Sequence, residues 1–210
     1  MQDIIIVGAS GFGRELLEVI GNINRKEPTW NVLGFIDDDL NALEPFEIPY
    51  KVLGTIRDWQ PTNREWYALA IAAPRTKEKL VPALKAKGAR FATILDPTAT
   101  IGARSRIGEG VVMFGQAGIS VDVTVGDFVF FNTLGGIGHD TVIGDYCTFA
   151  PKVCISGHTT FGRCVNVGAL ASTHPGVEIG DYATIGMNSA VFRKVKAGTT
   201  VVGVPAVKMF

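Results

Sequence analysis

Residues 137–162 read IGHDTVIGDYCTFAPKVCISGHTTFG, and this stretch repeats with a period of six. A large apolar residue stands at Ile137 and at every sixth position through Phe161. The same period runs through the second half of the chain. Its sixteen positions are Ile101, Ile107, Met113, Ile119, Val125, Phe131, Ile137, Ile143, Phe149, Ile155, Phe161, Val167, Thr173, Ile179, Ile185 and Val191. Fifteen of these sixteen residues are large and apolar, and Thr173 is the exception.

The residue after each large apolar position is mostly small, and the residue two before it is small or β-branched. The small residue after the apolar position is glycine, alanine or serine, as at Gly102, Gly144 and Gly168. A period of six fits neither an α-helix nor a β-hairpin, but it fits short strands joined by tight turns in a parallel β-helix. Three hexads make one triangular coil, so residues eighteen apart stack on one another. Sixteen hexads therefore predict a little over five coils without an insertion.

The composition limits the classes of function. The 210 residues are enough for two modules, and 47% hydrophobic residues with 19% charged residues predict a folded chain. Twenty basic and twenty acidic residues cancel, which argues against nucleic acid as a partner. No apolar run is long enough for a membrane span or a signal peptide, so we expect a cytoplasmic protein without membrane insertion. The three cysteines include no C-x-x-C pair, which favours reduced, buried thiols.

The first half of the chain alternates strand and helix patterns. The apolar run 4–7 leads into the glycine turn 8–13 and then into a helical pattern. Further strands are expected at 32–36, 67–72 and 91–95, the last one after a helix near 76–87. This order predicts a Rossmann-like α/β unit with a parallel sheet. We assign residues 1–96 to this unit and residues 97–210 to the β-helix.

The glycine turn is a candidate binding site for a nucleotide. A helix that begins at such a turn offers free N–H groups to an anion. The spacing G-x-x-G-x-G differs from the dinucleotide fingerprint G-x-G-x-x-G, so NAD binding is not indicated. The alternative to a nucleotide-binding role is a purely structural turn. Asp37 lies about 24 residues beyond Gly13, where an acidic residue can accept from a ribose hydroxyl. The predicted substrate-binding residues are Gly8, Ser10, Gly11, Gly13 and Asp37.

The combination of the two halves resembles a known family. The segments 8–15 and 34–38, followed by a hexad array, are similar to the hexapeptide-repeat acetyltransferases of nucleotide-sugar biosynthesis and the sialic acid O-acetyltransferase relatives. The resemblance implies a left-handed β-helix, a homotrimer and acetyl-CoA bound in the groove between neighbouring prisms. It implies acetylation of a UDP-, GDP- or dTDP-linked 4-amino-4,6-dideoxyhexose. It also implies acetyl-CoA contacts at Gly157, Gly168, Gly186 and Pro205.

A candidate general base lies in one turn of the array. The chain has three histidines, and His139 lies two residues past a lumen position, where its side chain should point outward. Asp140 follows it and can orient the imidazole. Gly157 lies eighteen residues beyond His139, so its N–H is a candidate donor to an oxyanion. The family resemblance places a catalytic histidine, an acidic residue and an oxyanion N–H at these same three positions.

The resemblance bears on three further positions. Asn132 matches a family asparagine close to the substrate, although a structural asparagine ladder would explain it equally well. Thr148 stands where some relatives have a second histidine at the cofactor. Asp96 replaces a common histidine before Pro97, so a histidine contact to the acceptor is not expected there.

Other functions remain open from the sequence. Trimeric carbonic anhydrases of this fold bind zinc through three histidines, but His139, His158 and His174 lack the H-x4-H pair, so we expect no metal. The same machinery could acetylate a sugar hydroxyl in place of an amine. A non-catalytic trimer that binds a nucleotide-linked sugar is the remaining alternative, and the joint presence of His139, Asp140 and Gly157 argues against it.

Overall fold

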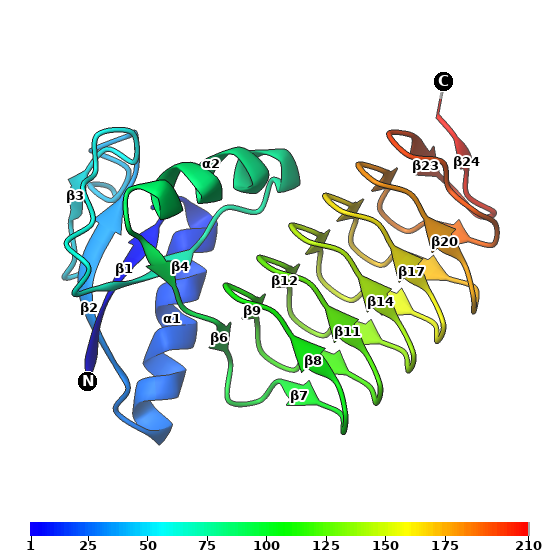
Figure 1. The fold of residues 1–210 in the computed structure, drawn as a ribbon, viewed down its shortest axis with the longest axis horizontal. Helices are drawn as coiled ribbons and strands as arrows, with labels where there is room; N and C mark the ends of the chain where they lie inside the picture. The colour runs from blue at the N-terminus through cyan, green and yellow to red at the C-terminus, as the bar shows by residue number, and fades with distance from the viewer. Residues whose placement is uncertain (210) are drawn as a thin grey trace.

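The computed structural model describes residues 1–209 and contains a small α/β unit followed by a long solenoid (Figure 1). The elements of the first unit are β1 (Gln2–Val7), α1 (Gly11–Lys26), β2 (Trp30–Ile36), β3 (Val52–Gly54), β4 (Trp66–Leu69), α2 (Pro74–Ala86) and β5 (Arg90–Phe91). The strands form one parallel sheet in the order β3-β2-β1-β4-β5. The predicted parallel α/β unit is confirmed.

Strand β1 lies at the centre of this sheet because Ile4–Val7 is apolar on both faces, and all four residues are buried. Helix α1 packs against the sheet through Leu16, Val19 and Ile20. The glycine turn allows the helix to start close to the strand. A Cβ atom at Gly13 would lie 2.1 Å from the carbonyl oxygen of Gly8, so the chain requires glycine there.

The solenoid has three flat faces, each built from one strand of every coil. The first sheet contains β6 (Ile94–Leu95), β9 (Val112–Met113), β12 (Phe130–Phe131), β15 (Thr148–Phe149), β18 (Asn166–Val167), β21 (Thr184–Ile185), β23 (Thr200–Val202) and β24 (Val207–Lys208). The second contains β7 (Thr100–Ile101), β10 (Gly118–Ile119), β13 (Gly136–Ile137), β16 (Cys154–Ile155), β19 (Ser172–Thr173) and β22 (Ala190–Val191). The third contains β8 (Arg106–Ile107), β11 (Thr124–Val125), β14 (Val142–Ile143), β17 (Thr160–Phe161) and β20 (Glu178–Ile179). We call them face B, face C and face D.

The strand register confirms the coil of eighteen residues. Ile119 pairs with Ile137 and Ile137 pairs with Ile155 in face C, and the large residue of each hexad points into the lumen. Phe131 and Phe149 stack there with ring centroids 5.0 Å apart. Most corner turns place one residue in the left-handed region, and most of these residues are not glycine, as at Asp140 (φ 56°) and His158 (φ 58°).

The solenoid begins earlier than the sequence boundary at residue 97. The strand expected at 91–95 is divided: β5 ends the α/β sheet at Phe91, whereas β6 pairs with β9 as the first strand of face B. Leu95 lies six residues before Ile101 and continues the hexad period. We missed this hexad because Asp96-Pro97 replaces the usual small residue after the apolar position.

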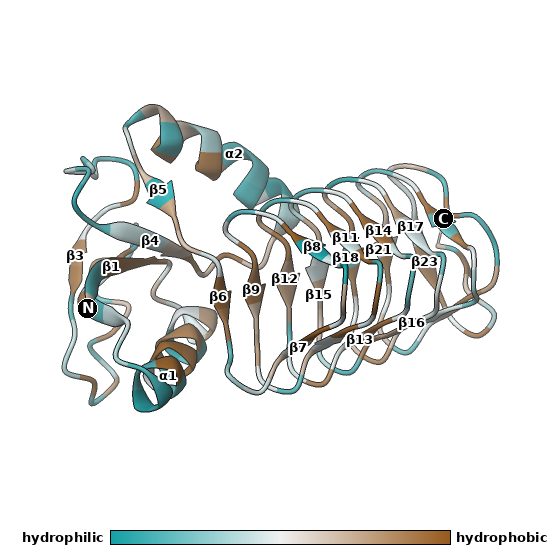
Figure 2. Ribbon diagram, turned by 60° about the horizontal axis from the view of Figure 1, so that its bottom comes forward, coloured by the Kyte–Doolittle hydropathy of each residue, from teal (hydrophilic) through white to brown (hydrophobic). Residues whose placement is uncertain are grey.

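The two units share a continuous apolar contact. Strands β9 and β12 of face B are hydrophobic (Figure 2), and Phe12 of the glycine turn packs against Phe114 and Phe130. On the other side of the sheet, residues of α2 share a core with Phe128. The hexads fill their own lumen, but their first coils also bury aromatic side chains under the α/β unit. The solenoid is therefore not an independent body beside the first unit.

A buried lysine on α2 fixes this contact. Lys77 is 2% exposed, and its Nζ donates hydrogen bonds to the carbonyl oxygens of Phe128 and Cys147 and to Thr148 Oγ1, at 2.8–2.9 Å. Thr148 Oγ1 in turn donates to the carbonyl oxygen of Ala72 at 2.6 Å. Burial lowers the pKa of the Lys77 ammonium to about 7.

Among residues 1–209, no helix has both the length and the apolar character needed to cross a membrane.

Replacing Lys77 with alanine should destabilise the protein. The substitution leaves a cavity and removes three hydrogen bonds, so we expect the free energy of unfolding to fall by about 2–4 kcal/mol. This loss of unfolding free energy should be larger at about pH 9 than at about pH 6. The folded wild type releases the Lys77 proton at a lower pH than the unfolded chain does, so its stability rises with pH between these two values, and the variant lacks this rise. Urea unfolding at both pH values measures both effects.

Lys79→Ala is the matched control, because Lys79 lies on the same helix and is exposed. That variant should unfold like the wild type at both pH values. A Lys77→Ala protein with wild-type stability would show that the buried ammonium does not hold the two units together.

Candidate active site

His139 lies on the edge between faces C and D, in the turn that joins β13 to β14. The turn is tight because Gly138 packs against the coil above it: a Cβ atom there would lie 2.4 Å from the Gly157 nitrogen. Asp140 adopts the left-handed conformation at the tip, and this directs its carboxylate back toward the imidazole. The edge thus presents both side chains outward, as the hexad position predicted.

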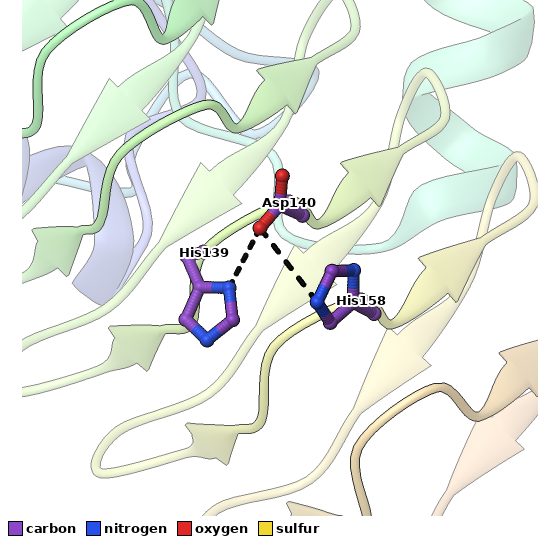
Figure 3. A group of neighbouring side chains, drawn as sticks. All are labelled: His139, Asp140 and His158. Atoms are coloured by element: carbon purple, nitrogen blue, oxygen red, sulfur yellow. Dashed lines mark hydrogen bonds and ion pairs between the residues drawn. The ribbon is translucent and has the colours of Figure 1, made fainter.

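The Asp140 carboxylate orients the imidazole. His139 Nδ1 lies 2.7 Å from Asp140 Oδ2, and the two side chains are 54% and 46% exposed (Figure 3). We assign the proton to Nδ1, because a carboxylate oxygen can only accept. His139 Nε2 then carries a free lone pair. The pair is arranged as a general base needs, with the accepting nitrogen opposite the orienting carboxylate.

Gly157 faces the imidazole from the next coil. A Cβ atom at this position would lie 2.7 Å from His139 Cε1 and 2.8 Å from Nε2, so any side chain would displace the ring. Within residues 1–209, the Gly157 N–H has no acceptor. The expected stacking of Gly157 on His139 is confirmed. A free N–H beside the basic nitrogen can donate to an oxygen that gains negative charge.

His158 also lies at this edge, one coil above Asp140, as the eighteen-residue stacking predicted. Its Nε2 is 3.8 Å from Asp140 Oδ2, and its ring is perpendicular to that of His139 with centroids 5.0 Å apart (Figure 3). Asp140 therefore lies between two imidazoles.

The glycine turn presents unused donors at the start of α1. Among the described residues, the N–H groups of Gly11, Phe12 and Gly13 have no acceptor, and the Ser10 side chain makes no capping hydrogen bond. These donors suit a phosphate group. Gly8 (φ 104°) requires glycine for its backbone conformation, whereas a Cβ atom at Gly11 would meet only the Arg14 side chain, at 3.8 Å.

Asp37 has a structural role in this turn. Its Oδ2 accepts from the Ala9 N–H at 2.7 Å, and its Oδ1 accepts from the Asp39 N–H at 2.9 Å. The carboxylate therefore ties the end of β2 to the glycine turn. Contact with a ribose remains a prediction for Asp37, and any such hydroxyl would share an oxygen that is already engaged.

Arg14 is a residue that the sequence analysis missed. Its guanidinium lies 3.4 Å above the Phe46 ring, and its Nε is buried without a hydrogen-bond partner among the described residues. Arg14 lies in the segment 8–15 that resembles the family, but the sequence gives no sign of this contact, because Phe46 comes from a distant loop.

Asn132 lies on another edge of the prism, between faces B and C. It lines a pocket of about 450 Å³ between α1 and the solenoid, together with Glu15, Glu18, Asp96 and Phe114. The chain does not bring Asn132 next to His139, because face C separates the two edges. Thr148 lies outside both places and is buried under α2.

The residues predicted to bind acetyl-CoA do not lie together: some lie on the His139 edge and others on the Asn132 edge. Gly157 lies beside His139, whereas Gly168 and Gly186 follow strands of face B and lie on the Asn132 edge. Pro205 lines a hollow of about 540 Å³ near the end of the solenoid with Phe192 and Val207. Their role in binding acetyl-CoA remains a prediction.

Known proteins share this architecture. Residues 3–84 match the family model of the PglD N-terminal domain. The structure of WeeI from Acinetobacter baumannii AYE has 30% identity and a TM-score of 0.87, over 100% of both chains. The acetyltransferase domain of PglB from Neisseria gonorrhoeae FA1090 has 21% identity and a TM-score of 0.89, also over 100% of both chains. PerB from Caulobacter crescentus, solved with CoA and GDP-perosamine, has 23% identity and a TM-score of 0.87, over 100% of this chain and 98% of PerB. No curated protein sequence matches the chain.

These similarities extend over both units in the same order. The solenoid is a left-handed parallel β-helix, so the predicted fold class is confirmed. The chain belongs to the same family as WeeI, and in it a PglD-type N-terminal domain is followed by a left-handed β-helix.

Proposed function

We propose that the protein transfers the acetyl group of acetyl-CoA to the amine of a nucleotide-linked amino sugar of the 4-amino-4,6-dideoxyhexose type. The observation that supports the proposal is the arrangement of His139, Asp140 and Gly157, in which an imidazole oriented by a carboxylate lies beside a free N–H. The similar PglB domain was solved with acetyl coenzyme A, and PerB with CoA and GDP-perosamine. These ligands support an amino sugar as the acceptor.

The reaction proceeds by direct attack. The neutral amine forms a bond to the thioester carbon, and His139 Nε2 takes the proton that the nitrogen loses. The Gly157 N–H stabilises the oxyanion of the tetrahedral intermediate. Collapse of the intermediate breaks the carbon–sulfur bond, and the coenzyme A thiolate leaves with the proton from the imidazolium. Asp140 stabilises that imidazolium through Nδ1.

The glycine turn holds the nucleotide. The free N–H groups at the start of α1 face the diphosphate, and the helix dipole favours its negative charge. This assignment gives the two units separate tasks: the α/β unit binds the nucleotide and the solenoid binds acetyl-CoA.

A homotrimer would join the two halves of the site. The outward residues of face C are all small: Thr100, Gly118, Gly136, Cys154, Ser172 and Ala190. Such a face allows close approach of another chain, and Leu134 and Leu170 are exposed on its edge. If face C of each chain lies toward a threefold axis, the Asn132 edge of one chain meets the His139 edge of its neighbour. The pocket beside Asn132 would then hold the sugar close to the base.

Replacing His139 with asparagine should lower turnover by roughly 100-fold or more while the affinity for acetyl-CoA changes little, because positioned proton transfer commonly contributes 10²- to 10⁴-fold. The assay measures formation of the acetylated product from UDP-, GDP- and dTDP-linked amino sugars. Matching nucleotide-linked sugars without the amine serve as the comparison for the acceptor group. His174→Asn is the control, since His174 is also exposed. Wild-type turnover in His139→Asn would exclude this residue as the base.

Gly157→Ala should leave the fold intact and remove most of the turnover. The new methyl group would displace the imidazole and crowd the oxyanion site, so we expect a loss of roughly 100-fold or more. Gly21→Ala in α1 is the control, because a Cβ atom there meets nothing closer than 3.5 Å. Calorimetric melting checks the fold of both variants, and an active Gly157→Ala enzyme would contradict the proposed oxyanion site.

The trimer is tested by Gly136→Arg, which places a long charged side chain at the centre of face C. We expect light scattering to show a homotrimer for the wild type and a smaller species with little activity for the variant. Thr160→Arg adds the same side chain on face D, where Thr160 is exposed, and should leave the trimer intact. A monomeric wild type at micromolar concentration would refute the assembly.

A further inference from the structure

The His139 edge carries a second imidazole for which the proposed reaction has no use. His158 is 63% exposed and makes no hydrogen bond through its side chain among the described residues. Its Nε2 points toward the carboxylate that orients His139 (Figure 3). His158 therefore forms a cluster with His139 and Asp140.

The cluster has the composition of a transition-metal site. One nitrogen of His139, one oxygen of Asp140 and one nitrogen of His158 all lie within 4.8 Å of one another. Two imidazoles and a carboxylate suit borderline divalent ions such as Zn²⁺ and Co²⁺. Bond lengths of about 2.0–2.2 Å require ligand atoms a little over 3 Å apart, so small movements of these exposed side chains would complete the site.

The neighbouring charges favour a site with three protein ligands. Asp122 lies one coil below Asp140, and Arg104 binds both of its carboxylate oxygens at 2.6 Å. Asp122 is therefore already paired. The remaining coordination positions face solvent and can hold water.

We propose that His139, Asp140 and His158 form an inhibitory site for a borderline divalent transition-metal ion. The inhibitory effect rests on the proposed function, because it requires His139 to be the base. An ion on Nδ1 takes the position of the proton that Nδ1 now shares with Asp140. The neutral ring then keeps its proton on Nε2, and that nitrogen has no lone pair to accept a proton from the amine. The bound ion also competes for the Asp140 carboxylate that would stabilise the imidazolium.

Binding is measured first without substrate. The full-length protein is titrated with CoCl₂ in chelator-free buffer, and the visible absorption of the Co²⁺ ion reports its ligands, while calorimetry with Zn²⁺ gives the stoichiometry. We expect one ion for each chain. His158→Asn removes one of the three proposed ligands and should weaken binding by at least roughly 10- to 100-fold, the loss that changing an outer-shell partner of a metal ligand already causes. His174→Asn should bind like the wild type, and thermal melting checks that both variants fold.

Inhibition is measured by chromatography of the acetylated product, because the free thiol of CoA also binds these ions. Co²⁺ should inhibit the wild type and His174→Asn reversibly, with full recovery on adding a chelator. His158→Asn should keep its turnover in metal-free buffer and require at least tenfold more Co²⁺ for inhibition.

Equal Co²⁺ binding by the wild type and His158→Asn would overturn the proposed site, as would the lack of a saturable one-to-one complex. Failure of the proposed function gives a different result. In that case His139→Asn would stay active, while the wild type would still bind Co²⁺ through the cluster and would not be inhibited by it.

Discussion

Each coil of the solenoid must close after eighteen residues, because its backbone groups pair with the coils on either side. An added residue would move every later lumen side chain to the outside and leave strand N–H groups unpaired. This constraint places residues eighteen apart directly over one another, at about the 4.8 Å spacing of neighbouring strands. The contacts of Gly157 with His139 and of His158 with Asp140 are consequences of that closure.

The chemistry of the edge depends on which side chains the repeat leaves outside. Most lumen positions are occupied by apolar residues, so charged groups lie at the turns and the outward strand positions, and the few polar side chains inside, such as Thr159 and Thr173, are hydrogen-bonded. On the edge between faces C and D, these positions hold an imidazole, a carboxylate and a glycine in contact. A side chain at Gly157 would occupy the space that the imidazole and a substrate oxygen need.

The contact between the two units explains an unusual feature of the first coils. The outward residues Val112 and Phe130 on face B are large and apolar, and Lys77 is buried against the backbone of these coils without a carboxylate partner among residues 1–209. An ammonium group in such a place is stable only because three oxygens accept from it. The α/β unit and the solenoid thus share a core, and Phe12 of the glycine turn packs directly on the first coils.

The sequence by itself determined the solenoid, the parallel α/β unit and the pairing of His139 with Asp140 and Gly157. These features follow from local rules: a period of six sets the coil, and fixed spacing sets which residues stack. The tertiary structure decided the rest. It placed Arg14 against Phe46, used Asp37 to hold the glycine turn and buried Thr148 under α2. Each of these results depends on how segments far apart in the chain pack together, and spacing along one segment carries no information about the surface that another segment will cover.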